Sequence, residues 1–121
     1  MFNKNINSIQ SKINKDLKAI YLSGPKSLVN TFNYVISGEG KRVRPLLTIL
    51  TSESLFEDFQ KSYNAALAIE ILHNFTLVHD DIMDNDSIRH GKETVHNKWD
   101  DSTAILTGDL MLAKSLKILS D

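Results

Sequence analysis

Four aspartates and a histidine crowd into ten positions of the sequence, the segment LVHDDIMDND at residues 77–86. Carboxylates repel one another and resist burial, so this density points to a bound cation. On a helix, Asp80 and Asp84 stand one turn apart and their carboxylates can converge. Asp81 lies about 100° round the helix, at the edge of the same face. Oxygen ligands in a chain without cysteine favour Mg²⁺. The alternative is a solvated acidic helix end, although acidic residues there oppose the helix dipole.

A basic turn precedes the aspartates, in the segment GEGKRVRP at residues 38–45. Two glycines open the backbone, and Lys41, Arg42 and Arg44 follow them. Ammonium and guanidinium groups at a glycine-rich turn entering a helix predict a diphosphate site, and the alternative is a solvated basic turn. The segment is not a P-loop, because Val35 stands where its first glycine is required and Arg42 where it has Ser or Thr.

A second basic segment, RHGKETVH at residues 89–96, follows the aspartates directly. It contributes Arg89 and His90 to the same part of the chain. A basic loop beside bound metal and phosphate would complete charge neutralisation. The alternative is a mixed-charge surface loop, which is the interpretation we favour for Lys92 and His96.

Helical spacing of apolar residues dominates the chain and predicts an all-α fold. A break at Gly24 and Pro25 separates the first two helices. Residues 85–98 are polar and predict a loop, and no segment predicts a strand. The five expected helices run through residues 6–20, 28–35, 45–56, 59–83 and 102–119, the fourth capped by Asp58 and the fifth by Asp101 or Ser102.

The bulk composition is that of one modest globular domain, with 121 residues, 41% hydrophobic and 24% charged. Cysteine is absent, which excludes disulfides and thiolate metal sites and favours a reducing cytoplasm. No apolar run is long enough to span a bilayer, and the first 20 residues lack the core of a signal peptide. A net charge of −1 gives no reason to expect nucleic acid as a partner.

Four motifs, taken together and in this order, resemble the trans-type isoprenyl diphosphate synthases (polyprenyl synthetases). They read EGKRVRP, DDIMD, RHGKET and TGDLMLA, and the resemblance covers nearly the whole chain. The resemblance is to the geranylgeranyl and other short-chain enzymes. It implies a helical bundle around a deep cavity and, with Mg²⁺, the condensation of isopentenyl diphosphate with an allylic diphosphate to a trans-polyprenyl diphosphate.

The resemblance also implies roles for the acidic motif. Asp80 and Asp84 would bind the Mg²⁺ that holds the allylic diphosphate, with Asp81 in support. Arg89 matches the arginine that contacts the same diphosphate. Together with Lys41, these are the residues that the resemblance implies for catalysis.

Isopentenyl diphosphate would be held by Lys41, Arg44 and His73, again by resemblance. His90 stands where the family usually has a second arginine for this substrate, and Glu39 replaces a glycine beside the same site. Neutral imidazole is a poorer phosphate partner than guanidinium. We therefore expect weak binding of isopentenyl diphosphate that improves at lower pH.

Product length in this family depends on the helical turn before the first aspartate. Phe75, five residues before Asp80, is bulky, and Thr76 is small. This pattern resembles geranylgeranyl synthases more than octaprenyl-type enzymes and implies a geranylgeranyl or farnesyl product. The alternative is that Phe75 is an ordinary core residue.

The family needs a second aspartate-rich motif, and nothing after residue 86 offers one. We therefore expect residues 1–121 to be the N-terminal part of a single domain, inactive alone and homodimeric at full length. One alternative is a non-catalytic partner subunit. Another is an HD-type metal phosphohydrolase, since His73, His79 and Asp80 follow its general pattern, but that class does not explain the basic turn.

Overall fold

The computed structural model of the chain describes residues 2–38, 40–56 and 60–121, and within them it confirms the all-α expectation. An antiparallel pair of two-residue strands is the remaining regular element, with Ile88 opposite Glu93 and Arg89 opposite Lys92. In chain order the elements are α1 (Phe2–Lys18), α2 (Lys26–Ile36), α3 (Val43–Phe56), α4 (Gln60–Asp84), β1 (Ile88–Arg89), β2 (Lys92–Glu93), α5 (Val95–Lys98) and α6 (Asp101–Ser120).

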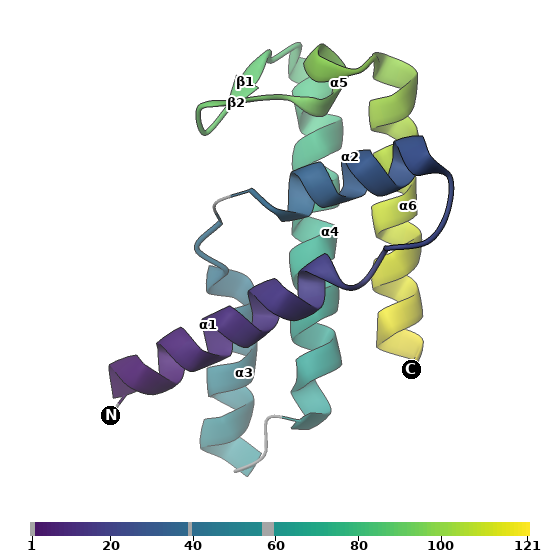
Figure 1. Ribbon diagram of the computed structural model, residues 1–121. Coiled ribbons are helices and arrows are strands. Elements are labelled where there is room, and N and C mark those ends of the chain that lie inside the picture. The colour runs from purple at the N-terminus through teal and green to yellow at the C-terminus, as the bar shows by residue number, and fades with distance from the viewer. Residues whose placement is uncertain (1, 39, 57–59) are drawn as a thin grey trace.

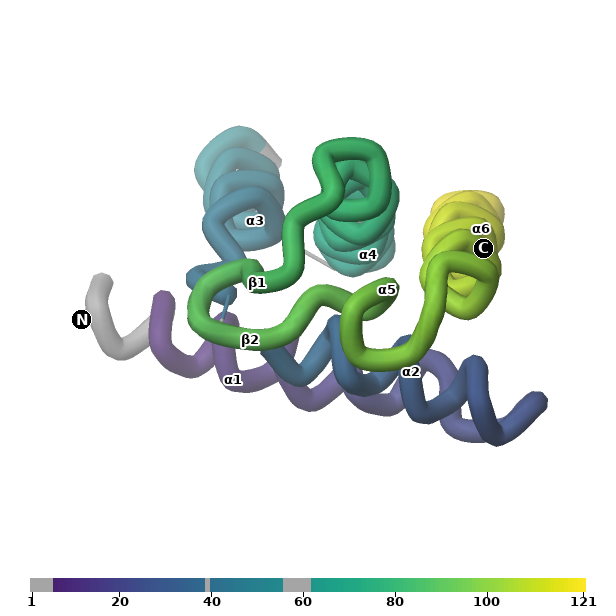
Figure 2. The backbone as a smooth tube through the Cα atoms, turned by 90° about the horizontal axis from the view of Figure 1, so that it is seen from above, coloured from purple at the N-terminus to yellow at the C-terminus, as the bar shows by residue number. Residues whose placement is uncertain are grey.

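The helices form two layers. Helices α3, α4 and α6 stand side by side, and α1 and α2 cross over one face of that row (Figure 1). Seen from above, down the axes of α3, α4 and α6, the hairpin and α5 lie beside the end of α4 at which the chain leaves it, on the side of α1 and α2 (Figure 2). None of the described helices is long and apolar enough to cross a membrane.

The core lies between the two layers. Each helix that lines it contributes its apolar stripe, and these side chains are fully buried: Ile13 and Leu17 of α1, Phe32 and Ile36 of α2, Ile49 of α3, Ile71 of α4 and Met111 of α6. A buried hydroxyl pair, Thr31 Oγ1 and Thr107 Oγ1 at 2.7 Å, joins α2 to α6. Gly108 allows α4 and α6 to approach closely, because a Cβ there would overlap the ring of His79.

Helix boundaries differ from the sequence predictions at α3 and α6. Helix α3 begins at Val43 rather than at Pro45. The proline lies in the first turn, where the helix does not need its missing N–H. The cap of α6 is Asp100, whose Oδ1 accepts a hydrogen bond of 2.7 Å from the Thr103 N–H. The predicted caps Asp101 and Ser102 are therefore wrong by one or two residues. The predicted cap Asp58 lies outside the described residues.

The polar segment after α4 is more ordered than a loop, since it contains the hairpin and α5. Helix α4 ends at Asp84 because Asn85 adopts a left-handed conformation, with φ of 53°. The Asp86 N–H then donates to the Asp81 carbonyl at 2.9 Å, closing the helix end. This turn directs the chain back over α4 into the hairpin.

Candidate functional site

A cavity of about 660 Å³ opens where the α2–α3 connection, the middle of α4 and the hairpin meet. Its lining includes the five residues to which the family resemblance assigned diphosphate binding: Lys41, Arg44, His73, Arg89 and His90. They come from three segments that are far apart in the sequence. Basic side chains around one hollow form a site suited to an anion with several oxygens.

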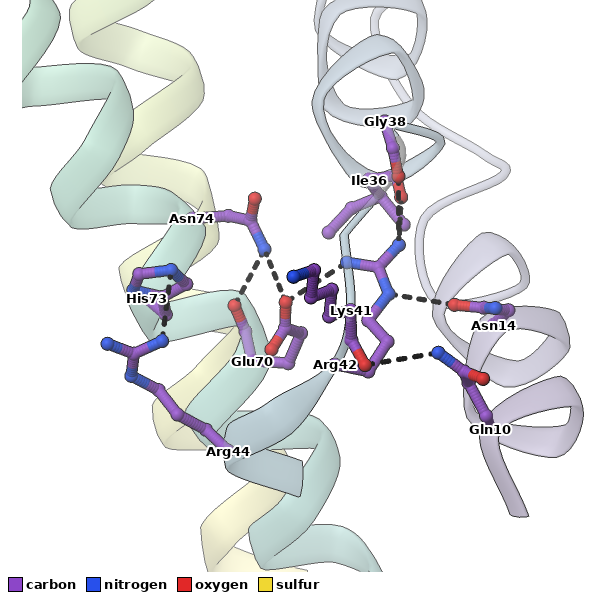
Figure 3. A network of polar contacts seen from close by, with 10 residues as sticks. All are labelled: Gln10, Asn14, Ile36, Gly38, Lys41, Arg42, Arg44, Glu70, His73 and Asn74. Carbon is purple, nitrogen blue, oxygen red and sulfur yellow. Dashed lines mark hydrogen bonds and ion pairs between the residues drawn. The ribbon is translucent and has the colours of Figure 1, made fainter. Parts of the chain in front are cut away.

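The basic loop, by which we mean residues 37, 38 and 40–44, brings two exposed cations to this cavity. Lys41 and Arg44 are both exposed, and Arg44 Nη1 lies 3.3 Å from Nε2 of His73 (Figure 3). Burial lowers the pKa of His73, and the positive charge of Arg44 lowers it further. The imidazole is therefore neutral at neutral pH, and it supplies hydrogen bonding beside the two positive charges.

Arg42, between these two cations, turns into the protein. The residue is 5% exposed, and its guanidinium is surrounded by acceptors (Figure 3). Nη1 donates to Glu70 Oε1 at 3.0 Å, Nε to Asn14 Oδ1 at 2.7 Å, and Nη2 to the Ile36 carbonyl at 2.6 Å. The sequence analysis grouped Arg42 with the diphosphate-binding cations, and the structure corrects this because its donors are already used within the protein.

Asp81 is the buried member of the acidic motif. The residue is 4% exposed and lines the cavity, whereas Asp80 and Asp84 are exposed. It pairs with Arg89, whose Nε and Nη2 donate hydrogen bonds of 2.7 to 3.0 Å to its two carboxylate oxygens. These hydrogen bonds raise the pKa of Arg89, and the nearby charge of Asp81 adds to them. Asp81 thus orients Arg89 at the cavity.

In helical projection His73 falls between Asp80 and Asp84, and these two aspartates are exposed on a face of α4 that we call its outer face and define by them and Thr76. They are not part of the cavity lining. Within the described part of the chain, neither carboxylate forms an ion pair, and no group of three or more acidic or imidazole side chains is placed to hold a metal. Two exposed carboxylates one turn apart nonetheless fit Mg²⁺, which takes most of its ligands from water and phosphate.

Phe75 and Thr76 lie on different sides of α4. Phe75 packs edge-on against the ring of His79, with centroids 4.8 Å apart, and His79 Nε2 lies 3.2 Å from the Ile105 carbonyl of α6. Phe75 is thus partly buried against the core on the side of α6, whereas Thr76 is exposed. The role of both residues in product length stays a prediction.

The hairpin carries His90 at its turn and is anchored to α2. His90 and Gly91 have φ of 51° and 78°, the left-handed pair typical of a tight two-residue turn, and His90 is exposed there. Lys92 Nζ donates to the Tyr34 carbonyl at 3.0 Å, and the Tyr34 hydroxyl donates to the Glu93 carbonyl at 2.8 Å. Burial lowers the pKa of Lys92. These contacts give Lys92 a structural role at the edge of the cavity.

Sequence reasoning missed the residues that support the basic loop from behind, namely Gln10, Asn14, Glu70 and Asn74. Glu70 had a detectable signal, because it interrupts the apolar stripe of α4 between Leu67 and Ile71. A charge at such a position predicts a buried partner. The other three are polar residues on helices and carry no comparable signal. Glu39, expected beside the site, lies outside the described residues.

Comparisons with known proteins place the chain among prenyl synthases. Residues 25–121 match the family model described as polyprenyl synthetase. The geranylgeranyl diphosphate synthase of Saccharolobus solfataricus is 44% identical over 115 residues, which are 95% of this chain and 35% of that protein.

Solved structures agree. The geranylgeranyl pyrophosphate synthetase of Geoglobus acetivorans superposes with a TM-score of 0.90 at 42% identity, over 95% of this chain and 38% of that one. The heptaprenyl diphosphate synthase of Staphylococcus aureus gives a TM-score of 0.89 at 38% identity, over 95% of this chain and 37% of that one. The chain therefore spans little more than a third of the length of these proteins.

Proposed function

The chain belongs to the polyprenyl synthetase family, and from this premise we propose that it forms the N-terminal part of a prenyltransferase domain. The reaction is the condensation of isopentenyl diphosphate with an allylic diphosphate to give a trans-polyprenyl diphosphate. The observation that carries this proposal is the meeting of Lys41, Arg44, His73 and Arg89 at one cavity.

Each group has a task that follows from its surroundings. Lys41 and Arg44 bind the diphosphate of isopentenyl diphosphate, and the neutral His73 donates a hydrogen bond to it. Arg89, held by Asp81, contacts the allylic diphosphate as it leaves. Permanent cations in fixed positions stabilise the charge that develops on this leaving group.

Asp80 and Asp84 would hold the metal ion. Bound Mg²⁺ supplies positive charge that helps the pyrophosphate to leave. The carboxylates suit this task because they are exposed, adjacent and without a protein cation as partner in the described chain. The second aspartate-rich motif of the family belongs to the part of the domain that this chain does not span.

His90 is the expected weak point of the isopentenyl diphosphate site. It stands exposed at the hairpin turn and lines the cavity, so it can face a bound diphosphate. Guanidinium there would add a permanent charge and two parallel hydrogen bonds. His90→Arg should lower the KM for isopentenyl diphosphate, and an unchanged KM would contradict this assignment.

The product is proposed to be geranylgeranyl or farnesyl diphosphate. Phe75 supports this, since a bulky residue at this position would stop a growing tail. Phe75→Ala should lengthen the product, and an unchanged product spectrum would contradict the proposal. A cytoplasmic location and a homodimer stay predictions.

The decisive experiment is an assay of the protein encoded by the complete reading frame. It is incubated with labelled isopentenyl diphosphate, each allylic diphosphate in turn and Mg²⁺, and the products are separated by chain length. We expect prenyl transfer by this protein and none by Asp80→Asn or by residues 1–121 alone. Phosphate release without isopentenyl diphosphate would instead support the phosphohydrolase. Activity only after mixing with a second subunit would support the partner-subunit alternative.

A further inference from the structure

We propose that Arg42 is a positioning residue for diphosphate binding, acting through the backbone of the basic loop. Its buried guanidinium holds Ile36, Gly38 and the start of α3 together so that Lys41 and Arg44 present their charges to the cavity. The nature of the ligand rests on the proposed function. The positioning itself rests on the contacts of Arg42, Asn14 and Glu70.

The ion pair between Arg42 and Glu70 is removed from water. Their side chains are 4% and 5% exposed, and Nη1 and Oε1 lie 3.0 Å apart. A charge pair in such a place is strongly directional, because neither partner can turn to solvent instead. Asn74 holds the carboxylate from the other side, through a hydrogen bond of 3.4 Å to the same oxygen. Glu70 therefore gives the loop a fixed point on α4.

The same guanidinium ties together the start of the basic loop. Nη2 donates to the Ile36 carbonyl at 2.6 Å and, more weakly, to the Gly38 carbonyl at 3.4 Å. The Arg42 carbonyl accepts from the Leu46 N–H at 3.1 Å, which starts α3. One residue thus connects the end of α2, the loop and the beginning of α3.

The backbone of Arg42 shows that these contacts set the path of the chain. Its φ is 55°, a left-handed backbone conformation that residues other than glycine seldom adopt. Such a conformation persists where the surroundings over-determine it. The reversal separates Arg42, which turns inward, from Lys41 and Arg44 on either side of it (Figure 3). A Cβ at Gly40 would stand 3.2 Å from Arg42 Nη1, so the neighbouring glycine leaves room for the inward turn.

Helix α1 completes the support. Asn14 Oδ1 accepts from Arg42 Nε at 2.7 Å, and Gln10 Nε2 donates to the Lys41 carbonyl at 3.1 Å. Helix α1 therefore holds the Lys41 carbonyl, and the side chain of the next residue, Arg42, is held by both α1 and α4. Residues 2–18 lie outside the segment that matches the family model.

The test compares Arg42→Lys with Thr31→Val in the protein from the complete reading frame. Lysine keeps the charge but cannot reach three acceptors at once. Thr31→Val breaks a buried polar pair with Thr107 that makes no hydrogen bond to the basic loop, and it controls for lost stability. We expect Arg42→Lys to raise the KM for isopentenyl diphosphate about tenfold or more, with the allylic KM changed less than about twofold. Amide hydrogen exchange in residues 37–46 should also become faster.

A second pair of variants covers the case in which Arg42→Lys does not fold. Asn14→Ala removes one acceptor from the guanidinium, and Asn14→Asp keeps an acceptor in the same place. The alanine variant should raise the KM for isopentenyl diphosphate selectively, and the aspartate variant should retain the parent value. This rescue distinguishes positioning from a general loss of packing.

Three results would overturn the inference. The first is an equal rise of both KM values in Arg42→Lys, and the second is the same selective rise in Thr31→Val. The third is an unchanged KM together with unchanged exchange in residues 37–46.

If the parent protein makes no prenyl product, the proposed function fails and the inference is judged by binding alone. Inorganic pyrophosphate is then titrated into the same proteins by calorimetry without Mg²⁺. Affinity weakened about tenfold in Arg42→Lys keeps the inference. Equal affinity in the two proteins, or no binding to either, overturns it.

Discussion

Helix α4 presents carboxylates on two faces, and the two sets differ in their exposure and in their ion pairing. On the inner face, Glu70 and Asp81 are each 4% exposed, and each has a guanidinium of its own. On the outer face, Asp80 and Asp84 are exposed and form no ion pair with any described residue. The same side-chain types on one helix thus divide into those that the protein neutralises and those that it leaves open.

The difference follows from desolvation. A buried carboxylate without a partner would cost several kcal/mol, so its cation must be built into the fold. An exposed carboxylate keeps its water and needs no partner. Only the outer pair is therefore available to a metal ion brought by a substrate.

The two guanidiniums on the inner face also differ. The side chain of Arg42 is 4% exposed and that of Arg89 is 33% exposed, although both pair with a buried carboxylate. Arg42 borders the same cavity, but its side chain is almost fully buried and its guanidinium is engaged by Asn14, Glu70 and the Ile36 carbonyl. Arg89 reaches the cavity while Asp81 holds it, which combines a fixed orientation with access to substrate.

Breaking the fully buried pair should have the largest effect. Arg42→Ala leaves Glu70 charged and unpaired, so we expect the free energy of unfolding to fall by about 3–5 kcal/mol. Urea unfolding followed by circular dichroism measures it. The double variant Arg42→Met, Glu70→Leu removes both charges and should recover much of the loss. A loss below about 1 kcal/mol in the single variant would show that the pair is not desolvated in solution.

Asp81→Asn should have an intermediate effect, since Arg89 is partly exposed and can turn to water. We expect a loss of about 1–3 kcal/mol in unfolding free energy from the broken charge-assisted hydrogen bonds. In the complete protein, the KM for the allylic diphosphate should rise because Arg89 is no longer oriented. Asp80→Asn is the neighbouring control for stability. Equal stability of the two variants would contradict the contrast between the faces.

A smaller effect should appear in the pH dependence, through His73 in the lining of the cavity. Burial lowers its pKa in the folded state, so the unfolded chain binds the proton more readily. The stability that this gives is present above the unfolded pKa of about 6.5 and is lost as the pH falls through the folded pKa. His73→Gln should flatten the fall in melting temperature between about pH 7 and 5. Parallel curves for the two proteins would show that another group is responsible.

The smallest effect on stability is expected on the outer face. Asp80→Asn or Asp84→Asn should change the unfolding free energy by less than about 0.5 kcal/mol, with a slight gain because two like charges one turn apart are separated. The same variants should abolish Mg²⁺-dependent prenyl transfer in the complete protein. A clear loss of stability would mean that an outer carboxylate has a structural partner.

The sequence predicted more of the site than of its support. The five residues that the family resemblance assigned to diphosphate binding all line one cavity. Their segments lie at the α2–α3 connection, on α4 and in the hairpin that follows α4. Arg42 was misjudged because its neighbours Lys41 and Arg44 are ligand candidates, and adjacency in sequence does not show which way a side chain turns. The hairpin was missed because two strands of two residues are too short for an alternating pattern.

By itself, the sequence determined the helical class, the order of the charged motifs and the spacing that puts Asp80 and Asp84 on one face. These follow from a local rule, the helical period of 3.6 residues, which needs no information about neighbours. Tertiary structure alone decided that Asp81 and Arg42 turn inward while Asp80 and Lys41 stay exposed. Neighbouring residues on a helix differ by about 100°, and only the packing of α1, α2 and the hairpin on α4 sets which of those directions is buried.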